Sequence, residues 1–236
     1  MTITETTSVA EIAAAVPSSV RVFQRHGVDF CCGGKKPIGV VCEEQGLSFA
    51  ELAGAIEAAA AGPADEQRDW AREPFGALID HIVTTYHDTL REELPRLEGM
   101  ASKVSQVHGA TAVYLARVEA IVRELATDLR AHMRKEEQVL FPAIRALETH
   151  EGLAPLRLST PIDVMEQEHD HAGALLAELR RITEGFVAPA WACQTFRALY
   201  HGLAELEASM HVHVHLENNV LFPRALERAG HAVAQS

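Results

Sequence analysis

The sequence predicts an all-α protein in which a small helical N-terminal domain precedes an up-down-up-down four-helix bundle. Short capped helices around one loop fill the first 60 or so residues. Beyond them, apolar residues recur at helical spacing along four long stretches that short loops separate. We therefore expect the small domain at 1–62, a polar linker at 63–74 and the bundle at 75–230.

Three helices are predicted in the small domain. Ser8 caps the first, with Glu11 at the capping-box position. Pro17 opens the second, and Ser48 caps the third. The stretch 29–39, Asp-Phe-Cys-Cys-Gly-Gly-Lys-Lys-Pro-Ile-Gly, is interpreted as the loop between the second and third helices.

The bundle helices are expected where apolar residues follow a period of 3.6 and where caps and breakers mark the ends. Their expected ranges are about 74–100, 111–148, 160–185 and 189–230.

Composition excludes several classes of protein. The chain of 236 residues carries 33 acidic and 21 basic residues, a formal net charge of -12, which argues against nonspecific nucleic-acid binding. No apolar run approaches 18 residues, so no membrane span is expected, and the N-terminus lacks the pattern of a secretory signal.

Four cysteines are too few for a disulfide scaffold, and the adjacent Cys31 and Cys32 are too close to pair with each other. Free thiols indicate a reducing compartment, so we expect the cytoplasm.

An internal repeat points to a metal site in the bundle. His132 and Glu136 belong to one copy of H-x-x-x-E-x-x-V-L-F-P, and His213 and Glu217 belong to a second copy. A single H-x-x-x-E pair is common on helix surfaces, but two copies with the same tail are not. Residues at i and i+4 project from one face of a helix, so each copy offers an imidazole and a carboxylate together.

A second matched pair supplies two more histidines. His87 and His169 are each followed by an aspartate, and each precedes one H-x-x-x-E copy by a similar distance. In a helical hairpin, residues equally far from the turn lie at the same height, so all four histidines should meet at one level. Buried imidazoles and carboxylates are unfavourable unless they bind something. We therefore predict two metal ions, each held by two histidines and bridged by Glu136 and Glu217. Mixed nitrogen and oxygen donors without thiolate suit iron, manganese or zinc, and the bridged octahedral environment favours iron.

These residues resemble the hemerythrin-like domain, over about 75–228. Residues 29–34, Asp-Phe-Cys-Cys-Gly-Gly, with their flanking helices resemble the N-terminal domain of the ScdA/YtfE group. Together they resemble the repair-of-iron-centres family of di-iron proteins. The resemblance implies two non-haem iron ions with an oxo bridge and a role in restoring iron–sulfur clusters damaged by nitric oxide or oxidants, by donating iron. Oxygen-carrying hemerythrins have a further histidine one turn after the first on the third helix, where this chain has Gly173.

Cys31 and Cys32 are the second chemical feature and the candidate catalytic residues. Lys35 and Lys36 would lower the pKa of a neighbouring thiol. The thiols could accept iron, exchange with a target or bind nitric oxide, and buried packing is the structural alternative. Cys193 is interpreted as structural, as is the remaining cysteine of the small domain, Cys42.

The remaining polar groups have more ordinary interpretations. Glu137 and Glu168 flank the expected ligands and could orient imidazoles or line a polar route for iron. His215 should face away from His213 and be exposed, and His108 has no partner at matched spacing.

Two other functions remain open from the sequence. One is an enzyme that reduces nitric oxide or peroxide at the di-iron site, and the other is a protein that binds or senses oxygen or nitric oxide. The expected partners are damaged iron–sulfur proteins and these small gases. A helical module of about 60 residues also favours a partner surface, which a homodimer would provide.

Overall fold

The computed structural model describes residues 2–31, 33–61, 69–149 and 158–234, and every regular element within these ranges is a helix. The all-α prediction is therefore confirmed. Cys32, residue 62 and residues 63–68 of the expected linker lie outside the described residues. No helix among the described residues is both long enough and apolar enough to cross a membrane.

The chain divides into two compact units. One comprises Met1–Ile79, Ile144–Ser159 and His211–Ser236, and the other comprises Asp80–Ala143 and Thr160–Met210. Four helices run across the boundaries between these segments, so the division falls within helices of the bundle.

The small domain lies in the first unit, and its described residues form four helices. They are α1 (Val9–Ala15), α2 (Ser19–His26), α3 (Ile38–Gln45) and α4 (Phe49–Ala60). The predicted capping box is present, because Glu11 N–H donates to Ser8 Oγ at 3.2 Å and Ser8 N–H donates to Glu11 Oε2 at 3.0 Å. Ser48 caps α4 as expected. The three-helix prediction was wrong by one element: α3 begins after Pro37 and ends at Gly46, whose φ of 67° is the left-handed conformation that glycine adopts without strain.

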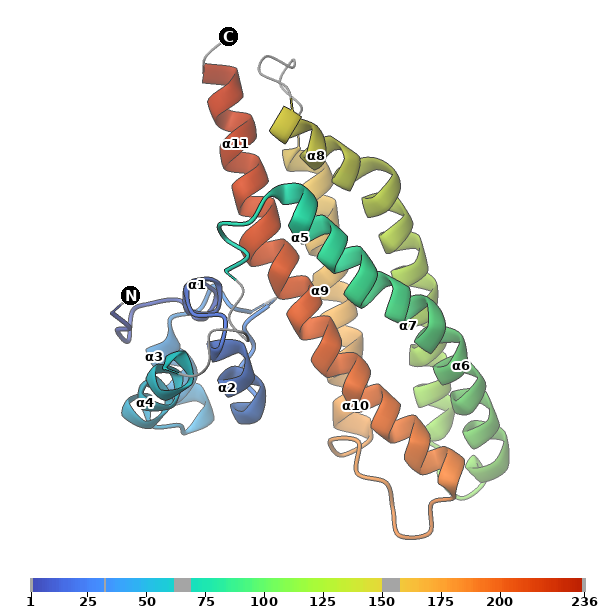
Figure 1. Cartoon of the computed structure of the whole chain (residues 1–236). Helices are drawn as coiled ribbons and strands as arrows, with labels where there is room; N and C mark the ends of the chain where they lie inside the picture. Colours follow the sequence, from blue (N-terminus) through green and yellow to red (C-terminus); the bar gives the residue numbers. More distant parts are fainter. Residues whose placement is uncertain (1, 32, 62–68, 150–157, 235–236) are drawn as a thin grey trace. The chain divides into compact units, whose positions relative to one another are not determined.

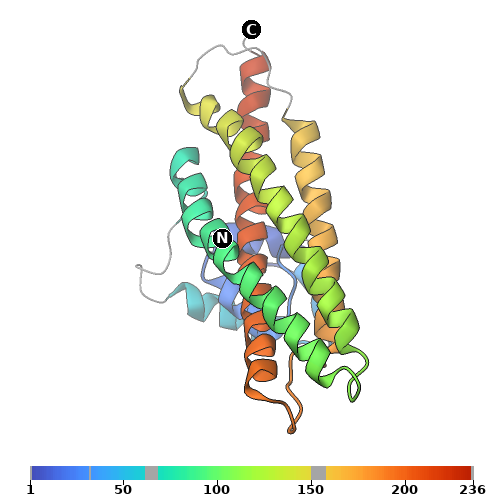
Figure 2. The same cartoon turned by 90° about the vertical axis from the view of Figure 1, so that its right-hand side faces the viewer.

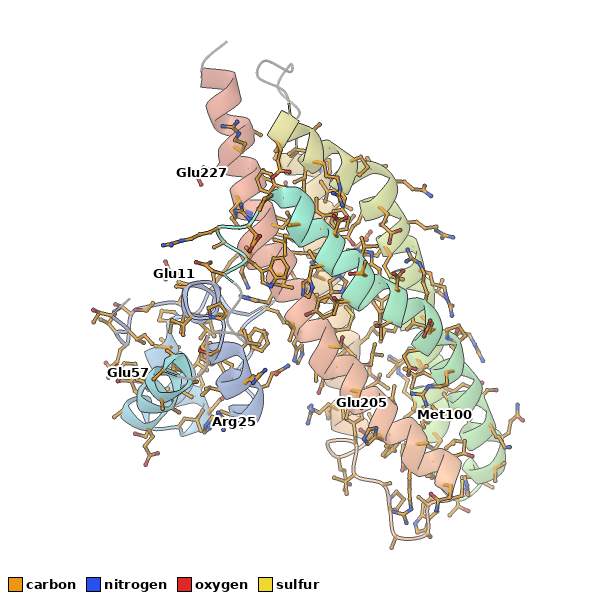
Figure 3. The ribbon with its side chains drawn as sticks, in the orientation of Figure 1. Glu11, Arg25, Glu57, Met100, Glu205 and Glu227 are labelled. Atoms are coloured by element: carbon orange, nitrogen blue, oxygen red, sulfur yellow. The ribbon has the colours of Figure 1, made fainter. Side chains whose placement is uncertain are left out.

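A continuous apolar core holds these short helices together. Phe23, Phe30, Ile38 and Ile56 are each 0% exposed, and the rings of Phe23 and Phe30 stack at 6.1 Å. Charged side chains cover the outside of the domain, as Glu11, Arg25 and Glu57 show in Figure 3. These exposed side chains contribute to the net charge of the chain, and apolar side chains form the core of the small domain.

The long helices carry the predicted bundle. Those before residue 150 are α5 (Phe75–Ile82), α6 (Asp88–His108), α7 (Leu115–Lys135) and α8 (Phe141–Thr149); those after it are α9 (Ser159–Ile182), α10 (Gln194–His215) and α11 (Phe222–Ala234). α6 and α7 run antiparallel, side by side, and meet at a short turn (Figures 1 and 2). α6 continues past the expected end near Met100 to His108, because Ala101 and Val104 extend its buried face by one more turn.

In the described part of the bundle, three short π-helical segments interrupt the helices. They are η2 (Val83–His87), η3 (Glu136–Leu140) and η4 (Leu216–Leu221). Each joins the helix before it to the helix after it without a break, so that α10, η4 and α11 form one column (Figure 1).

Candidate metal centre

All six side chains that the repeat singles out are buried. His87, Glu136 and Glu217 are 0% exposed, His169 and His213 are 1% exposed, and His132 is 3% exposed. Ionisable side chains are rarely buried to this extent unless they are paired or bind a metal.

The six residues form two groups that share both carboxylates. In one group, ligand atoms of His87, Glu136, His213 and Glu217 all lie within 4.8 Å of one another. In the other group, His132 and His169 join the same two glutamates within the same distance. The third cluster of this kind among the described residues, Glu124 with Asp128 and His171, lies in exposed positions.

Individual contacts show how the donor atoms converge. Glu136 Oε2 lies 3.4 Å from His87 Nε2 and 3.3 Å from His132 Nε2. His213 Nε2 lies 3.1 Å from Glu217 Oε1. His132 Nε2 and His169 Nε2 approach to 2.9 Å. Two imidazole nitrogens at this distance share at most one proton, whereas a cation would use both lone pairs, so the donor set fits metal ions.

Carboxylates behind two of the histidines fix their tautomer. His87 Nδ1 lies 2.6 Å from Glu137 Oε1, and His132 Nδ1 lies 2.9 Å from Glu168 Oε2. A carboxylate accepts a hydrogen bond, so Nδ1 carries the proton and the Nε2 lone pair faces the cluster. This is the arrangement that orients metal-binding histidines. The structure thus favours the orienting role that the sequence left open for these two glutamates.

Basic side chains pair with the same carboxylates. Arg91 donates to Glu137 at 2.5 and 2.6 Å, and Lys135 donates to Glu168. Partial burial alone would raise the pKa of Glu168, but the hydrogen bonds from Lys135 and His132 bring that pKa below its ordinary value.

The π-helical segments coincide with the site. η2 ends at His87, η3 begins at Glu136, and η4 contains Glu217. π-turns of this kind are frequent at functional sites because they reorient side chains within a continuous helix. Two of the segments, η3 and η4, lie just before Pro142 and Pro223, where each proline leaves one carbonyl without its helical donor.

The loop of the small domain wraps around Asp29. Its Oδ1 accepts hydrogen bonds from Cys31 N–H at 2.9 Å and from the Cys31 thiol at 3.3 Å, and its Oδ2 accepts from Gly33 N–H at 2.8 Å. A Cβ atom at Gly33 would lie 2.7 Å from the same carboxylate oxygen, so a side chain there would displace the carboxylate. The basic neighbour Lys36 pairs with Glu44 at 2.8 Å, whereas the Cys31 thiol donates to the Asp29 carboxylate.

The structure corrects one sequence interpretation, that of His215. His215 is 3% exposed, not exposed as expected, because Phe30 of the small domain covers it, and burial lowers its pKa to about 4 against an opposing hydrogen bond with the Phe30 backbone. His108 belongs to neither ligand group, and its Nε2 lies 3.3 Å from Cys193 Sγ. Cys42 is buried and Cys193 is exposed.

A helical bundle that gathers four histidines and two shared glutamates defines a class of proteins with a dinuclear metal centre. Comparison with known families identifies the class more closely. Residues 78–225 match the hemerythrin HHE cation binding domain, and residues 5–60 match the ScdA_N domain, described as a domain of unknown function (DUF542). The chain belongs to the hemerythrin HHE cation-binding family.

Individual relatives extend this similarity over most of the chain. It is 40% identical over 219 residues to proteins named iron-sulfur cluster repair protein YtfE from Pectobacterium carotovorum subsp. carotovorum and Pectobacterium atrosepticum. It is 39% identical to the protein of the same name from Yersinia pseudotuberculosis. Each alignment covers 93% of this chain and 96% of the relative. The chain is a homologue of these proteins and carries a buried His/Glu di-metal site.

Proposed function

We propose that the protein repairs iron–sulfur clusters damaged by nitric oxide or oxidants and that it does so by donating iron. The observation that carries this proposal is the pair of buried ligand groups that share Glu136 and Glu217. The relatives named as iron–sulfur cluster repair proteins support the same activity. In this proposal the ligands are His87, His132, His169 and His213 with the two bridging glutamates, and the cargo is two non-haem iron ions with an oxo bridge.

The ligand count supports release of the iron. Each group offers two imidazoles and two shared carboxylates, which leaves octahedral iron with positions that no side chain fills. Gly173 stands where oxygen-carrying hemerythrins have a further histidine. A less saturated centre favours exchange over stable gas carriage.

A pocket provides a route between one ligand group and solvent. It has a volume of about 350 Å³ and is lined by His132 and His169 at its inner end and by exposed Asp128 and His171 at its outer end. Glu168 also lines it. An iron ion leaving along this path would meet oxygen and nitrogen donors at successive positions.

The remaining parts of the proposal follow from the small domain. Cys31 and Cys32 would assist delivery by accepting iron as thiolates, and damaged iron–sulfur proteins would be the recipients. Cys42 and Cys193 form no disulfide, which supports action in a reducing cytoplasm. We place the small domain at 1–62, the linker at 63–74 and the di-iron bundle at 75–230. The homodimer expected from the sequence stays a prediction.

Iron transfer to a damaged cluster protein tests the proposal. The protein loaded with two irons per chain is mixed with a [4Fe–4S] protein that nitric oxide has damaged, together with sulfide and a thiol reductant. The cluster absorbance of the recipient should recover with loaded protein and should not recover with the Glu136→Ala, Glu217→Ala double variant. No recovery with an intact, loaded metal site would refute iron donation.

The pocket also favours a second candidate function, because it would admit nitric oxide to His132 and His169. In that case the protein would reduce nitric oxide, or peroxide, at the metal site. Steady production of nitrous oxide by the reduced protein, unchanged in Cys31→Ala, Cys32→Ala, would favour the enzyme. A stable, reversible gas adduct without turnover or iron loss would instead favour a sensor.

A further inference from the structure

A stripe of side chains on the α10–η4 column faces away from the ligands and toward the small domain. His211, His215 and Asn219 follow one another at intervals of four, so they share one face of the helical column. α1 packs against η4, and Val212 packs against the apolar core of the small domain. The helix that supplies His213 and Glu217 therefore also forms the docking surface for the small domain.

Asn219 makes the central polar contact of this surface. Its Nδ2 donates to the Phe30 carbonyl oxygen at 2.9 Å and lies 3.0 Å from His215 Nδ1. A side-chain amide has two N–H donors, so it can make both bonds at once. The Phe30 ring meets His215 edge-on at 5.6 Å and His211 at 6.1 Å, so the residue is held through both its backbone and its side chain.

The residue that Asn219 holds directly precedes the thiol. Asp29 and Cys31 flank Phe30, and the Asp29 carboxylate binds the Cys31 backbone and thiol. A Cβ atom at Gly34 would lie 2.7 Å from the Phe30 carbonyl oxygen, so the turn closes tightly around the group that Asn219 contacts. With the loop held in this way, Cys31 is only 6% exposed.

The same short segment connects this contact to the metal centre. Glu217 and Asn219 both belong to η4, two residues apart, so one points into the ligand cluster and the other points toward Phe30. A π-turn is a local irregularity in the helix, and a cation bound by Glu217 would fix its backbone. Loss of that cation would leave η4 with fewer restraints and would weaken the Asn219 contact.

We propose that Asn219 is a positioning residue through which occupancy of the metal centre controls access to the Cys31 thiol. With metal bound, η4 holds Phe30 and the thiol stays shielded. When the metal leaves Glu217, the loop loosens and Cys31 becomes accessible, at the moment when an acceptor thiol is needed. The use of this coupling in iron delivery rests on the proposed function, but the coupling itself is a property of this chain. By linkage, the state of the loop must also affect metal affinity.

The rate of Cys31 alkylation tests this coupling directly. The full chain carrying Cys32→Ser, so that the labelled peptide reports Cys31 alone, is treated with iodoacetamide in the metal-loaded and metal-free forms and followed by mass spectrometry. One hydrogen bond of ordinary net strength corresponds to about a two- to tenfold change in an opening equilibrium. Cys31 should therefore be alkylated about two- to tenfold faster in the metal-free protein.

Variants of Asn219 should remove the dependence on metal. Asn219→Ala deletes both hydrogen bonds. Asn219→Asp keeps the shape of the side chain but removes the N–H group that donates to the Phe30 carbonyl oxygen. In both variants, the loaded protein should label at the fast rate while metal content per chain and the absorption spectrum of the centre stay unchanged. Gln45→Ala is the matched control, because Gln45 Nε2 donates to the Gly27 carbonyl at 3.3 Å within the small domain and does not involve η4. That control should keep the wild-type difference between the two forms.

Two results would overturn the proposal. One is an equal alkylation rate for Cys31 in the loaded and metal-free protein, and the other is a wild-type difference that survives in both Asn219 variants. The outcome is separable from the proposed function. If the labelling difference follows Asn219 but no iron reaches a damaged cluster, coupling stands and iron donation fails.

Discussion

Removing the Glu137 carboxylate, which lies behind His87, should weaken the binding of one of the two metal ions and leave the binding of the other nearly unchanged. Glu137 Oε1 accepts a hydrogen bond from His87 Nδ1 at 2.6 Å, so it holds both the ring orientation and the tautomer that points Nε2 at the cluster. Loss of such an orienting partner typically lowers metal affinity by roughly 10- to 100-fold, which is about 1.4 to 2.7 kcal/mol. His87 belongs to only one of the two ligand groups, so the loss should be confined to one ion.

Competition with a chromophoric chelator under anaerobic conditions measures this effect. Glu137→Ala should change iron(II) binding from two tight steps to one tight and one weak step. Glu168→Ala should do the same at the other group, because Glu168 orients His132. The double variant should weaken both steps.

Glu98→Ala is the control for loss of a charged side chain that pairs with an arginine. Glu98 on α6 pairs with Arg130 on α7, whereas Glu137 on η3 pairs with Arg91 on α6. It should leave both metal affinities as in the wild type. The reasoning is refuted if Glu137→Ala binds both ions with wild-type affinity, or if Glu98→Ala weakens binding by the same factor.

Three further outcomes can be measured on purified variants. Phe141 is 2% exposed and its ring stacks on His87 at 5.8 Å, so Phe141→Ala should lower the free energy of unfolding by about 3–5 kcal/mol in urea titrations, and a loss below about 1 kcal/mol would contradict the packing. Arg224 donates to two backbone carbonyls just before α5, at 2.9 and 2.7 Å, so Arg224→Ala should destabilise the protein by about 1–3 kcal/mol, where an unchanged melting temperature would be inconsistent. Burial, together with a nearby glutamate, raises the pKa of the Cys42 thiol, so less Cys42 thiolate exists at pH 8. Iodoacetamide should therefore label exposed Cys193 well before buried Cys42, and the reverse order would disprove this.

Local periodicity explains why the metal cluster could be found in the sequence. His132 with Glu136, and His213 with Glu217, are one helical turn apart, and that spacing alone places each pair on one face. The matched position of His87 and His169 then needs only antiparallel helices with short turns. The structure brings all six side chains into two groups, which is the arrangement that this spacing predicts.

Features that depend on contacts between distant segments were not predictable in this way. The helical face of His215 was correctly assigned as pointing away from His213, but its burial depends on Phe30, which lies far away in the sequence. The same holds for the contact between His108 and Cys193. The missed helix α3 has a weak amphipathic pattern over only eight residues, and its packing against the rest of the small domain decides its conformation. The π-turns lie inside otherwise continuous helices, so periodicity alone does not reveal them.

Metal content together with the optical spectrum of the purified protein tests the di-iron assignment. We expect two irons per chain and oxo-to-iron charge-transfer bands in the oxidised form, and loss of these bands in the Glu136→Ala, Glu217→Ala double variant. One metal ion per chain, or zinc in place of iron, would contradict the di-iron assignment.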